Sequence, residues 1–305
     1  MNNMRLLFAA ALTATFASAA EVAPRVVKDV EFLAPGRAEK LDVYLPAPLP
    51  TGKLSPAVVW IHGGGWVGGT KDEARAKEIC GTLAAAGYVA LSIDYKLGDL
   101  AWPTNLLDCK NAVRFLRAHA TEYRVDPERI GVAGGSAGGN LALLVAYTTG
   151  KKELEPEAPY PGVSSAVRCV IDMYGITNAL TRQNMAPDGT PNGVLRDAES
   201  PRVFGGPRTT HAAVWALGSP VTHVTASSPP TLILHGHADQ TVDYAQAEEL
   251  DRVLKAHGVE HEAILLDGVG HTFDWETWNK KPLPHDLRPV ALAFFGKHLG
   301  SPVTK

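Results

Sequence analysis

The chain has 305 residues, of which 45% are hydrophobic, 20% charged and 7% aromatic, as in an ordinary globular protein. Its formal net charge is −3 and like charges do not cluster in long runs, so the sequence lacks the basic footprint of a nucleic-acid-binding protein. The composition excludes a collagen-like or disordered chain and predicts no nucleic-acid partner.

The first twenty residues have the pattern of a secretory signal peptide. Arg5 precedes an apolar run that begins at Leu6, and small residues end the segment at Ala19 and Ala20. The run is shorter than the roughly 20 residues of a membrane-spanning helix, and no other stretch is apolar for long enough to cross a bilayer. We therefore expect a secreted or periplasmic protein without a membrane span, with residues 1–20 removed and residues 21–305 forming the catalytic domain.

Apolar runs that suit strands alternate with segments of helical period along most of the chain. Two strands come first, at 26–33 and 40–45, with a turn between them. The later strands are expected at 57–61, 88–93, 130–133, 167–173, 231–234 and 263–266, and the helices at 71–86, 106–120, 141–147, 245–256 and 290–299. This alternation predicts an α/β fold with a mostly parallel central sheet and helices on both faces.

Residues 175–221 interrupt the alternation. This stretch is rich in proline and glycine, including Asp188-Gly189 and Asn192-Gly193, and shows little periodicity. A loop-rich segment of this length inside an α/β domain is usually functional, so we expect a cap or lid over a binding site. Its conformation, like the oligomeric state, cannot be derived from the residue pattern.

The three cysteines, Cys80, Cys109 and Cys169, lie in helix-like or strand-like segments. They form no C-x-x-C motif, which disfavours a zinc or redox site, and we interpret them as small buried hydrophobic residues. An odd count permits at most one internal disulfide, and whether any two pair is left open.

The sequence Gly134-Gly135-Ser136-Ala137-Gly138 directly follows an expected strand and directly precedes an expected helix. A nucleophilic serine needs such a strained strand-to-helix turn, which holds its Oγ proud of the sheet. A phosphate loop would instead require Lys followed by Ser or Thr, which is absent here. The motif therefore predicts Ser136 as a nucleophile.

A second glycine motif, His62-Gly63-Gly64-Gly65-Trp66, follows the expected strand at 57–61. A tetrahedral intermediate needs backbone N–H donors aimed at its developing oxyanion, and glycines expose such donors. We expect Gly63, Gly64 and Ala137 to form this oxyanion hole, with His62 bracing the loop.

A carboxylate and an imidazole complete the expected site. Asp239 follows the strand at 231–234, and His271 follows the last strand in a glycine-framed loop. The chain order Ser, Asp, His predicts that Asp239 orients His271 and that His271 moves the proton of Ser136. Asp243 is a competitor for Asp239, but it lies farther from the strand end.

The string His235-Gly236-His237-Ala238-Asp239 also permits a metal-site interpretation. No third region of the sequence offers a set of partner ligands, so neither a metal nor a cofactor is predicted.

These motifs together resemble the α/β-hydrolase serine esterases, over residues 40 to 299. The groups resembled are the hormone-sensitive-lipase-like and the feruloyl-esterase-like carboxylesterases. The position of the insertion at 175–221 favours the latter. Two departures from the pattern are Gly135, where an acidic or other side chain is common, and Lys96, where arginine is common.

The resemblance implies a secreted serine carboxylesterase that hydrolyses short-chain or aromatic esters, such as feruloyl or acetyl groups on plant polysaccharide. Alternatives are a lipase for longer acyl chains, a serine peptidase or amidase on the same fold, and a binding protein without activity. The expected ligand is a small-molecule or polysaccharide-linked ester. Aromatic side chains expected to wall its pocket are Trp66, Tyr174, Trp215 and Trp275.

Overall fold

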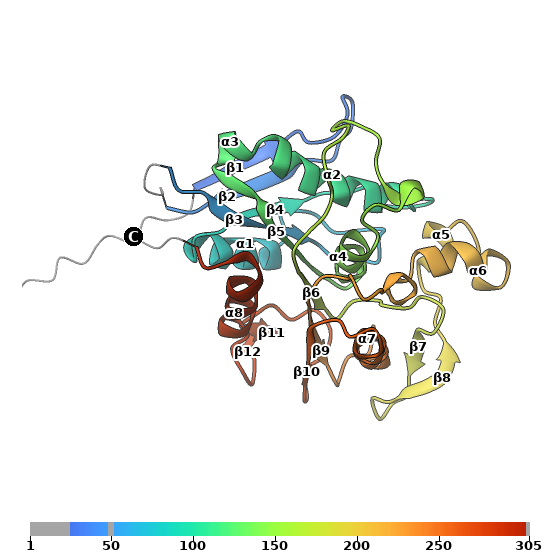
Figure 1. Ribbon diagram of the computed structural model, residues 1–305. Coiled ribbons are helices and arrows are strands. Elements are labelled where there is room, and N and C mark those ends of the chain that lie inside the picture. The colour runs from blue at the N-terminus through green and yellow to red at the C-terminus, as the bar shows by residue number, and fades with distance from the viewer. Residues whose placement is uncertain (1–24, 48–51, 303–305) are drawn as a thin grey trace, which may run out of the picture.

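An eight-stranded sheet forms the centre of the protein (Figure 1). The computed structural model describes residues 25–47 and 52–302, so the signal peptide expected at 1–20 lies outside the described residues. In spatial order the strands are β1 (Arg25–Val30), β2 (Leu41–Leu45), β4 (Val89–Ile93), β3 (Ser55–Ile61), β5 (Val125–Gly135), β6 (Val170–Met173), β9 (Thr231–Gly236) and β10 (His261–Leu266). The β1–β2 and β2–β4 pairs are antiparallel, and every later pair is parallel.

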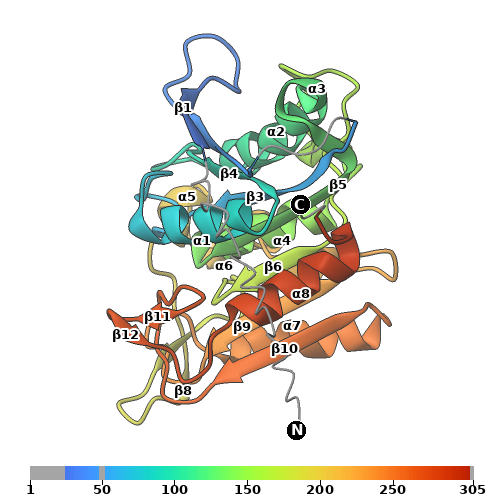
Figure 2. The same cartoon turned by 90° about the vertical axis from the view of Figure 1, so that its left-hand side faces the viewer.

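Helices cover both faces of the sheet (Figure 2). One face packs against α1 (Ala74–Ala85) and α8 (Arg288–Leu299). The other packs against α2 (Thr104–Ala118), α4 (Ala137–Tyr147) and α7 (Ala245–Ala256). Two short pieces, α3 (Ala120–Tyr123) and the 3-10 turn Lys152–Leu154, lie in the connections. The α/β fold with a mostly parallel sheet, predicted from the alternation, is confirmed.

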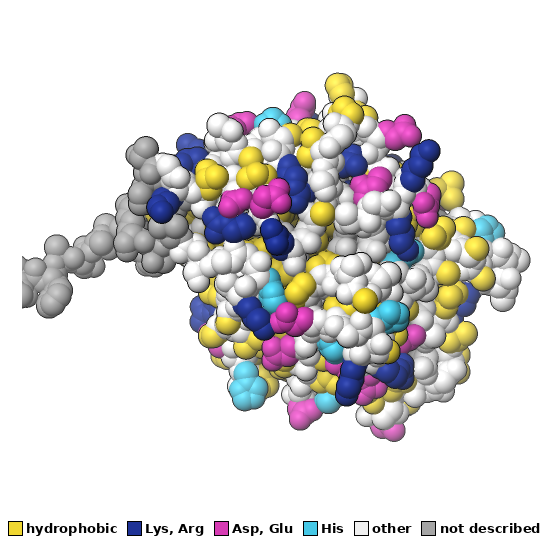
Figure 3. Space-filling view, in the orientation of Figure 1, with side chains coloured by type: hydrophobic (Ala, Val, Ile, Leu, Met, Phe, Trp, Pro, Cys, Tyr) yellow, Lys and Arg dark blue, Asp and Glu magenta, His cyan; other side chains and the backbone are white. Residues whose placement is uncertain are grey.

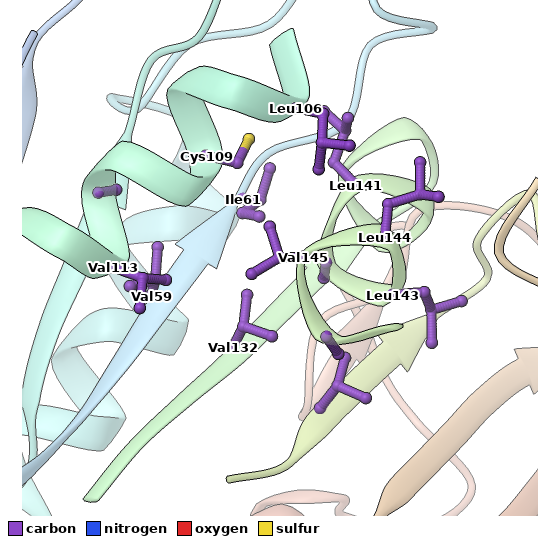
Figure 4. Packing of buried hydrophobic residues seen from close by; sticks show 14 of the residues in the cluster. Val59, Ile61, Leu106, Cys109, Val113, Val132, Leu141, Leu143, Leu144 and Val145 are labelled. Atoms are coloured by element: carbon purple, nitrogen blue, oxygen red, sulfur yellow. The ribbon is translucent and has the colours of Figure 1, made fainter. Parts of the chain in front are cut away.

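The core between the sheet and α2 and α4 is fully closed to solvent (Figure 4). Val59 and Ile61 of β3 and Val132 of β5 belong to the same buried cluster as Val113 of α2 and Val145 of α4, all with no exposed surface. Burying each such aliphatic side chain contributes about 1.5–3 kcal/mol. The carboxyl ends of β3 and β5 therefore sit on a rigid base.

The bounds of helices and strands differ from the predicted ones mainly where the periodicity of apolar residues is weak. β5 begins at Val125, because Val125 pairs with Ser55 and a register irregularity then leads to the buried stretch from Ile130. A small hairpin, β11 (Thr277–Trp278) with β12 (Lys281–Pro282), was not predicted because strands of two residues carry no periodic signal.

The segment 175–221 is a folded insertion beside the sheet (Figure 1). It contains the antiparallel hairpin β7 (Gln183–Met185) and β8 (Pro191–Leu195) and the helices α5 (Ser200–Val203) and α6 (Arg208–Leu217). The 3-10 turn Pro220–His223 begins at its end and extends two residues beyond it. Asn140 of α4 fastens both ends of the insertion, since the side-chain amide donates to the carbonyls of Ile176 (2.8 Å) and Gly218 (3.0 Å). The insertion is thus tied to the helix that follows Ser136.

The cysteines Cys80, Cys109 and Cys169 are buried and unpaired, as expected of small core residues. Within residues 25–47 and 52–302, no helix combines the length and the apolar character that crossing a membrane requires.

Candidate active site

Ser136 occupies the sharp turn between β5 and α4. Its backbone adopts φ 58° and ψ −122°, a conformation that non-glycine residues rarely take and that costs of order 1–3 kcal/mol. Two backbone hydrogen bonds hold the turn: Ser136 N–H donates to Met173 O (2.9 Å), and Asn140 N–H donates to Ser136 O (3.0 Å). The strain presents the Ser136 hydroxyl at the carboxyl edge of the sheet.

His271 lies between Ser136 and Asp239. Its Nε2 is 2.9 Å from Ser136 Oγ, and its Nδ1 is 2.6 Å from Asp239 Oδ2. The backbone of His271 is held by Trp278, whose Nε1–H donates to His271 O (3.0 Å). The structure therefore brings together three side chains from the ends of β5, β9 and β10, where the sequence analysis placed them.

The carboxylate of Asp239 is buried and fully hydrogen-bonded. Its Oδ1 accepts the backbone N–H groups of Thr241 (2.8 Å) and Val242 (3.0 Å). Burial alone would raise the pKa of Asp239, but interactions with His235 and His271 outweigh it and hold that pKa well below the usual range. Asp239 is therefore an ionised acceptor for the imidazole of His271 at neutral pH.

His235 is a neighbour that sequence reasoning considered only as a metal ligand. Its Nε2 donates to Val242 O (3.0 Å) and lies 3.4 Å from Asp239 Oδ2. Among the described residues, no group of three or more His, Cys, Asp or Glu side chains is arranged to hold a metal ion. His235 instead supports the Asp239 loop.

Asp243, the alternative candidate for the carboxylate beside His271, contacts the insertion instead. Its Oδ2 accepts the backbone N–H of Gln183 at 2.7 Å, at the start of β7. Asp239, rather than Asp243, is the carboxylate that contacts His271.

The glycine loop after β3 lies directly against the Ser136 turn. A Cβ on Gly63 would stand 2.9 Å from Gly135 O and 3.1 Å from Ser136 Cβ, so only glycine permits this approach. No backbone or side-chain acceptor of the described chain takes the N–H of Gly63 or Gly64. Both glycines line the same cavity as Ser136, and Ala137 is the first residue of α4.

His62 braces this loop, as expected. Its Nδ1–H donates to Gly63 O (2.6 Å), its ring stacks on Tyr95, and Tyr95 Oη–H donates to His62 O (2.8 Å). Burial lowers the pKa of His62, which favours the neutral form of the ring at neutral pH.

A cavity of about 480 Å³ opens over Ser136 and His271. The residues that line it include five charged ones and no Phe, Tyr or Trp. The charged side chains that line it are Glu73, Arg75, Arg182, Arg196 and Glu199. None of these five was predicted, because they come from loops and from the insertion, where no local pattern marks a binding residue.

The expectation that Trp66, Tyr174, Trp215 and Trp275 wall the pocket is corrected by the structure. All four side chains are at most 2% exposed, and none lines the cavity. Trp66 and Trp215 both pack against Phe204, which joins the insertion to the glycine loop. Their large apolar areas stabilise the core instead.

The surface seen in Figure 3 carries Lys and Arg side chains interspersed with Asp and Glu. This face therefore shows no broad field of one sign, and the charges of the cavity act locally.

The chain is similar to a family model and to known esterases. The family model BD-FAE matches residues 41–254. Among relatives from Mycobacterium tuberculosis, the probable carboxylic ester hydrolase LipM is 31% identical over 81% of this chain and 56% of LipM, and esterase LipC is 32% identical over 78% of this chain and 57% of LipC. The chain thus spans little more than half the length of these relatives.

Solved structures share the fold. The esterase Est2 of the planctomycete Thermogutta terrifontis is 26% identical, with 94% of this chain and 96% of Est2 covered and a TM-score of 0.71. Est2 has also been solved with propionate bound and phosphorylated by paraoxon. A truncated carbohydrate esterase from gut microbiota, 24% identical with a TM-score of 0.78 over 92% of this chain and 98% of that one, has the same fold. The architecture is that of the α/β-hydrolase esterases.

Proposed function

Since the chain belongs to the BD-FAE family, we propose that it is a carboxylic ester hydrolase that acts through Ser136, His271 and Asp239. The observation that carries the proposal is the continuous hydrogen-bonded series Asp239 Oδ2, His271 Nδ1, His271 Nε2 and Ser136 Oγ, which ends in the cavity. A nucleophile, a base and an orienting carboxylate within hydrogen-bond reach are what acyl transfer requires.

The first half of the reaction forms an acyl-enzyme. Ser136 Oγ attacks the ester carbonyl while His271 Nε2 takes the hydroxyl proton. The carbonyl oxygen becomes an oxyanion, which the N–H groups of Gly63, Gly64 and Ala137 stabilise. His271 then returns its proton to the alkoxide as the C–O bond breaks, and the alcohol leaves.

The second half releases the acid. His271 takes a proton from water, whose oxygen attacks the acyl carbonyl on Ser136, and the intermediate collapses to a carboxylic acid with the proton returned to Ser136. Asp239 holds the imidazole in the tautomer with Nδ1 protonated and stabilises the imidazolium that forms in both halves.

The substrate class is proposed on the size and lining of the cavity. A volume of about 480 Å³ accommodates a short acyl chain or an aromatic acid with part of its alcohol. Binding of propionate by the Thermogutta esterase supports a short acyl group. Acetyl or feruloyl esters on plant polysaccharide fit this description.

The decisive experiment compares the purified protein with Ser136→Ala on p-nitrophenyl butyrate. We expect activity to fall by several orders of magnitude in the variant, since the members of such a triad act as a unit. Paraoxon should inactivate the parent protein, and peptide mass spectrometry should locate the adduct on Ser136. Near-parental turnover by Ser136→Ala, or an adduct on another residue, would reject the assignment.

We also propose that the protein is exported, on the basic, apolar and small-residue pattern of residues 1–20. Sequencing the N-terminus of protein recovered from the envelope or medium of the native host tests this. Export with cleavage predicts a start near Ala20 or Glu21, and intact Met1 contradicts it.

A further inference from the structure

Two arginines of the insertion face the active-site cavity from the same end of the β7–β8 hairpin. Arg182 directly precedes β7, and Arg196 directly follows β8. The backbone N–H of Arg196 donates to Arg182 O at 2.8 Å, which holds the two residues side by side. Both residues line the cavity that contains Ser136 and His271.

Arg182 is a buried cation without a carboxylate partner. Its side chain is 4% exposed, and its one hydrogen bond to a described residue runs from Nη2 to Thr241 O (2.8 Å). Its Nε lies buried with no hydrogen-bond partner. Burial and the neighbouring charge of Arg196 lower the pKa of Arg182 to about 10, so the guanidinium remains charged at neutral pH.

The other two arginines of the insertion are each paired with a carboxylate. Arg208 forms an ion pair with Asp197 (2.5 Å), and Arg202 forms one with Asp99 (2.7 Å). Within residues 25–47 and 52–302, no carboxylate lies within ion-pair distance of Arg182 or Arg196. The unpaired cations of the insertion are therefore the two that face the cavity.

The carboxylates near this pair lie beyond ion-pair distance. The negative charges of Glu199, Asp243 and Asp239 act on Arg182 and oppose the lowering of its pKa, but none of the three forms an ion pair with it. Glu73 and Arg75 lie 3.7 Å apart and offset each other, and Arg75 also donates to Thr272 O (3.1 Å). Glu199 lies over the glycine loop, where its Oε2 would be 3.2 Å from a Cβ on Gly65. Among the cavity-lining residues that come from the insertion, Arg182 and Arg196 are thus accompanied by one carboxylate, Glu199.

We propose that the ester substrate of this enzyme carries a carboxylate, which Arg182 and Arg196 bind while Ser136 attacks the ester. The inference rests on the proposed ester hydrolysis and specifies its substrate class. A guanidinium presents its N–H donors in a planar fork that matches a carboxylate, and such charge-assisted bonds are strong where water is excluded. A bound carboxylate would supply the partner that buried Arg182 lacks and so offset the cost of its burial.

Matched ester pairs test the proposal and show which side of the ester carries the charge. For the acyl side, mono-4-nitrophenyl adipate is compared with its neutral methyl ester. For the alcohol side, 3-acetoxybenzoate is compared with methyl 3-acetoxybenzoate. We expect kcat/KM to be at least about tenfold higher for the anion in one of the two pairs, as for a charge-assisted hydrogen bond. High salt should reduce the preference.

Variants then assign the preference to the arginines. Arg196→Gln should reduce the ratio of anionic to neutral kcat/KM about tenfold, mainly through KM, since a partly exposed charge-assisted hydrogen bond is lost. Arg182→Lys retains the charge without the planar fork and should show a smaller loss of the ratio. Arg202→Gln, which removes an exposed and paired cation of the same insertion, is the matched control and should leave the ratio unchanged.

Equal or faster hydrolysis of the neutral ester in both pairs would overturn the proposal. So would an unchanged ratio in Arg196→Gln. In either case Ser136-dependent hydrolysis of the neutral esters would still stand as evidence for the proposed function. Absence of Ser136-dependent hydrolysis of all four esters would instead reject both.

Discussion

The ring of Tyr174 lies edge-on against the imidazole of His271, with 4.8 Å between the ring centroids. Tyr174 directly follows β6, and its Oη–H donates to Phe273 O (2.8 Å) in the loop that carries His271. The ring occupies space beside Gly135, where a Cβ would stand 2.7 Å from Tyr174 Oη. The glycine at position 135, a departure from the pattern of related esterases, is thus complementary to Tyr174.

Gly135→Ala should therefore lower kcat strongly while changing the thermal unfolding of the protein only a little. The added methyl group pushes Tyr174 aside and moves His271 away from Ser136, and small misplacements of reacting groups can cost about a hundredfold in rate. We expect kcat for p-nitrophenyl butyrate to fall by about tenfold to a hundredfold. Steady-state kinetics together with thermal unfolding would separate the two effects.

Gly81→Ala is the control for that variant. Gly81 lies in α1, and a Cβ there meets nothing within 4 Å. This variant should keep full activity and gain about 0.5–1 kcal/mol of stability. Combining Gly135→Ala with Tyr174→Phe removes the closest clashing atom and should recover part of the activity. Parental kcat in Gly135→Ala would show that Tyr174 does not position His271.

Asp239→Asn should abolish most activity while preserving the fold. An asparagine offers its amide N–H to the imidazole and favours the tautomer that cannot accept the Ser136 proton, which costs about ten-thousand-fold in comparable triads. The matched variant Asp243→Asn alters a carboxylate that contacts Gln183 and not His271. Single-turnover rates should show a far smaller loss for Asp243→Asn, and equal losses would contradict the assignment of Asp239.

One buried carboxyl group should contribute to stability in a way that diminishes as the pH rises from about 4 to 7. Asp172 on β6 has no exposed surface, and burial raises its pKa to about 7. The pKa of Asp172 in the folded protein lies above the unfolded value of about 3.9, so the folded protein binds the proton more tightly. The stabilisation that this proton gives is therefore lost as the pH rises from the unfolded pKa to the folded pKa.

Asp172→Asn cannot ionise and should escape that loss. The free energy of unfolding of Asp172→Asn relative to the parent protein should increase between pH 5 and pH 8 in urea titrations. The exposed variant Asp188→Asn should show no such increase, because an exposed carboxylate is ionised in both states over this range. A pH-independent difference for Asp172→Asn would mean that Asp172 is ionised in the folded protein.

Hydrolysis should favour short acyl chains. Ile176 is the aliphatic residue among those that line the cavity, five of which are charged, and α6 buries only Trp215. We expect kcat/KM to fall steeply from p-nitrophenyl butyrate to laurate, without a jump in rate above the solubility limit. The carbonyl chemistry is shared, so the difference reports the acyl pocket. Equal rates or interfacial activation would indicate a lipase.

Local sequence signals were sufficient to predict the fold and the edge of the sheet where the candidate site lies. Buried strands can be recognised in the sequence as short apolar runs. The turn at Ser136 can be recognised from the glycines that precede and follow it, without knowledge of any tertiary contact. In a parallel sheet, residues just beyond the carboxyl ends of strands gather at one edge. That rule places Ser136, Asp239 and His271 together from their positions in the chain alone.

The tertiary structure decided what surrounds those three residues. Arg182 and Arg196 reach the cavity because the hairpin β7–β8 docks against the rest of the protein through bonds such as that from Gln183 N–H to Asp243 Oδ2. Nothing in the insertion's own sequence encodes that direction. Tyr174 and Trp215 were expected at the pocket and lie in the core, since burial of an aromatic ring depends on which neighbours the fold provides. Strand ends follow from short-range pattern, whereas the lining of a cavity follows from contacts between segments far apart in the chain.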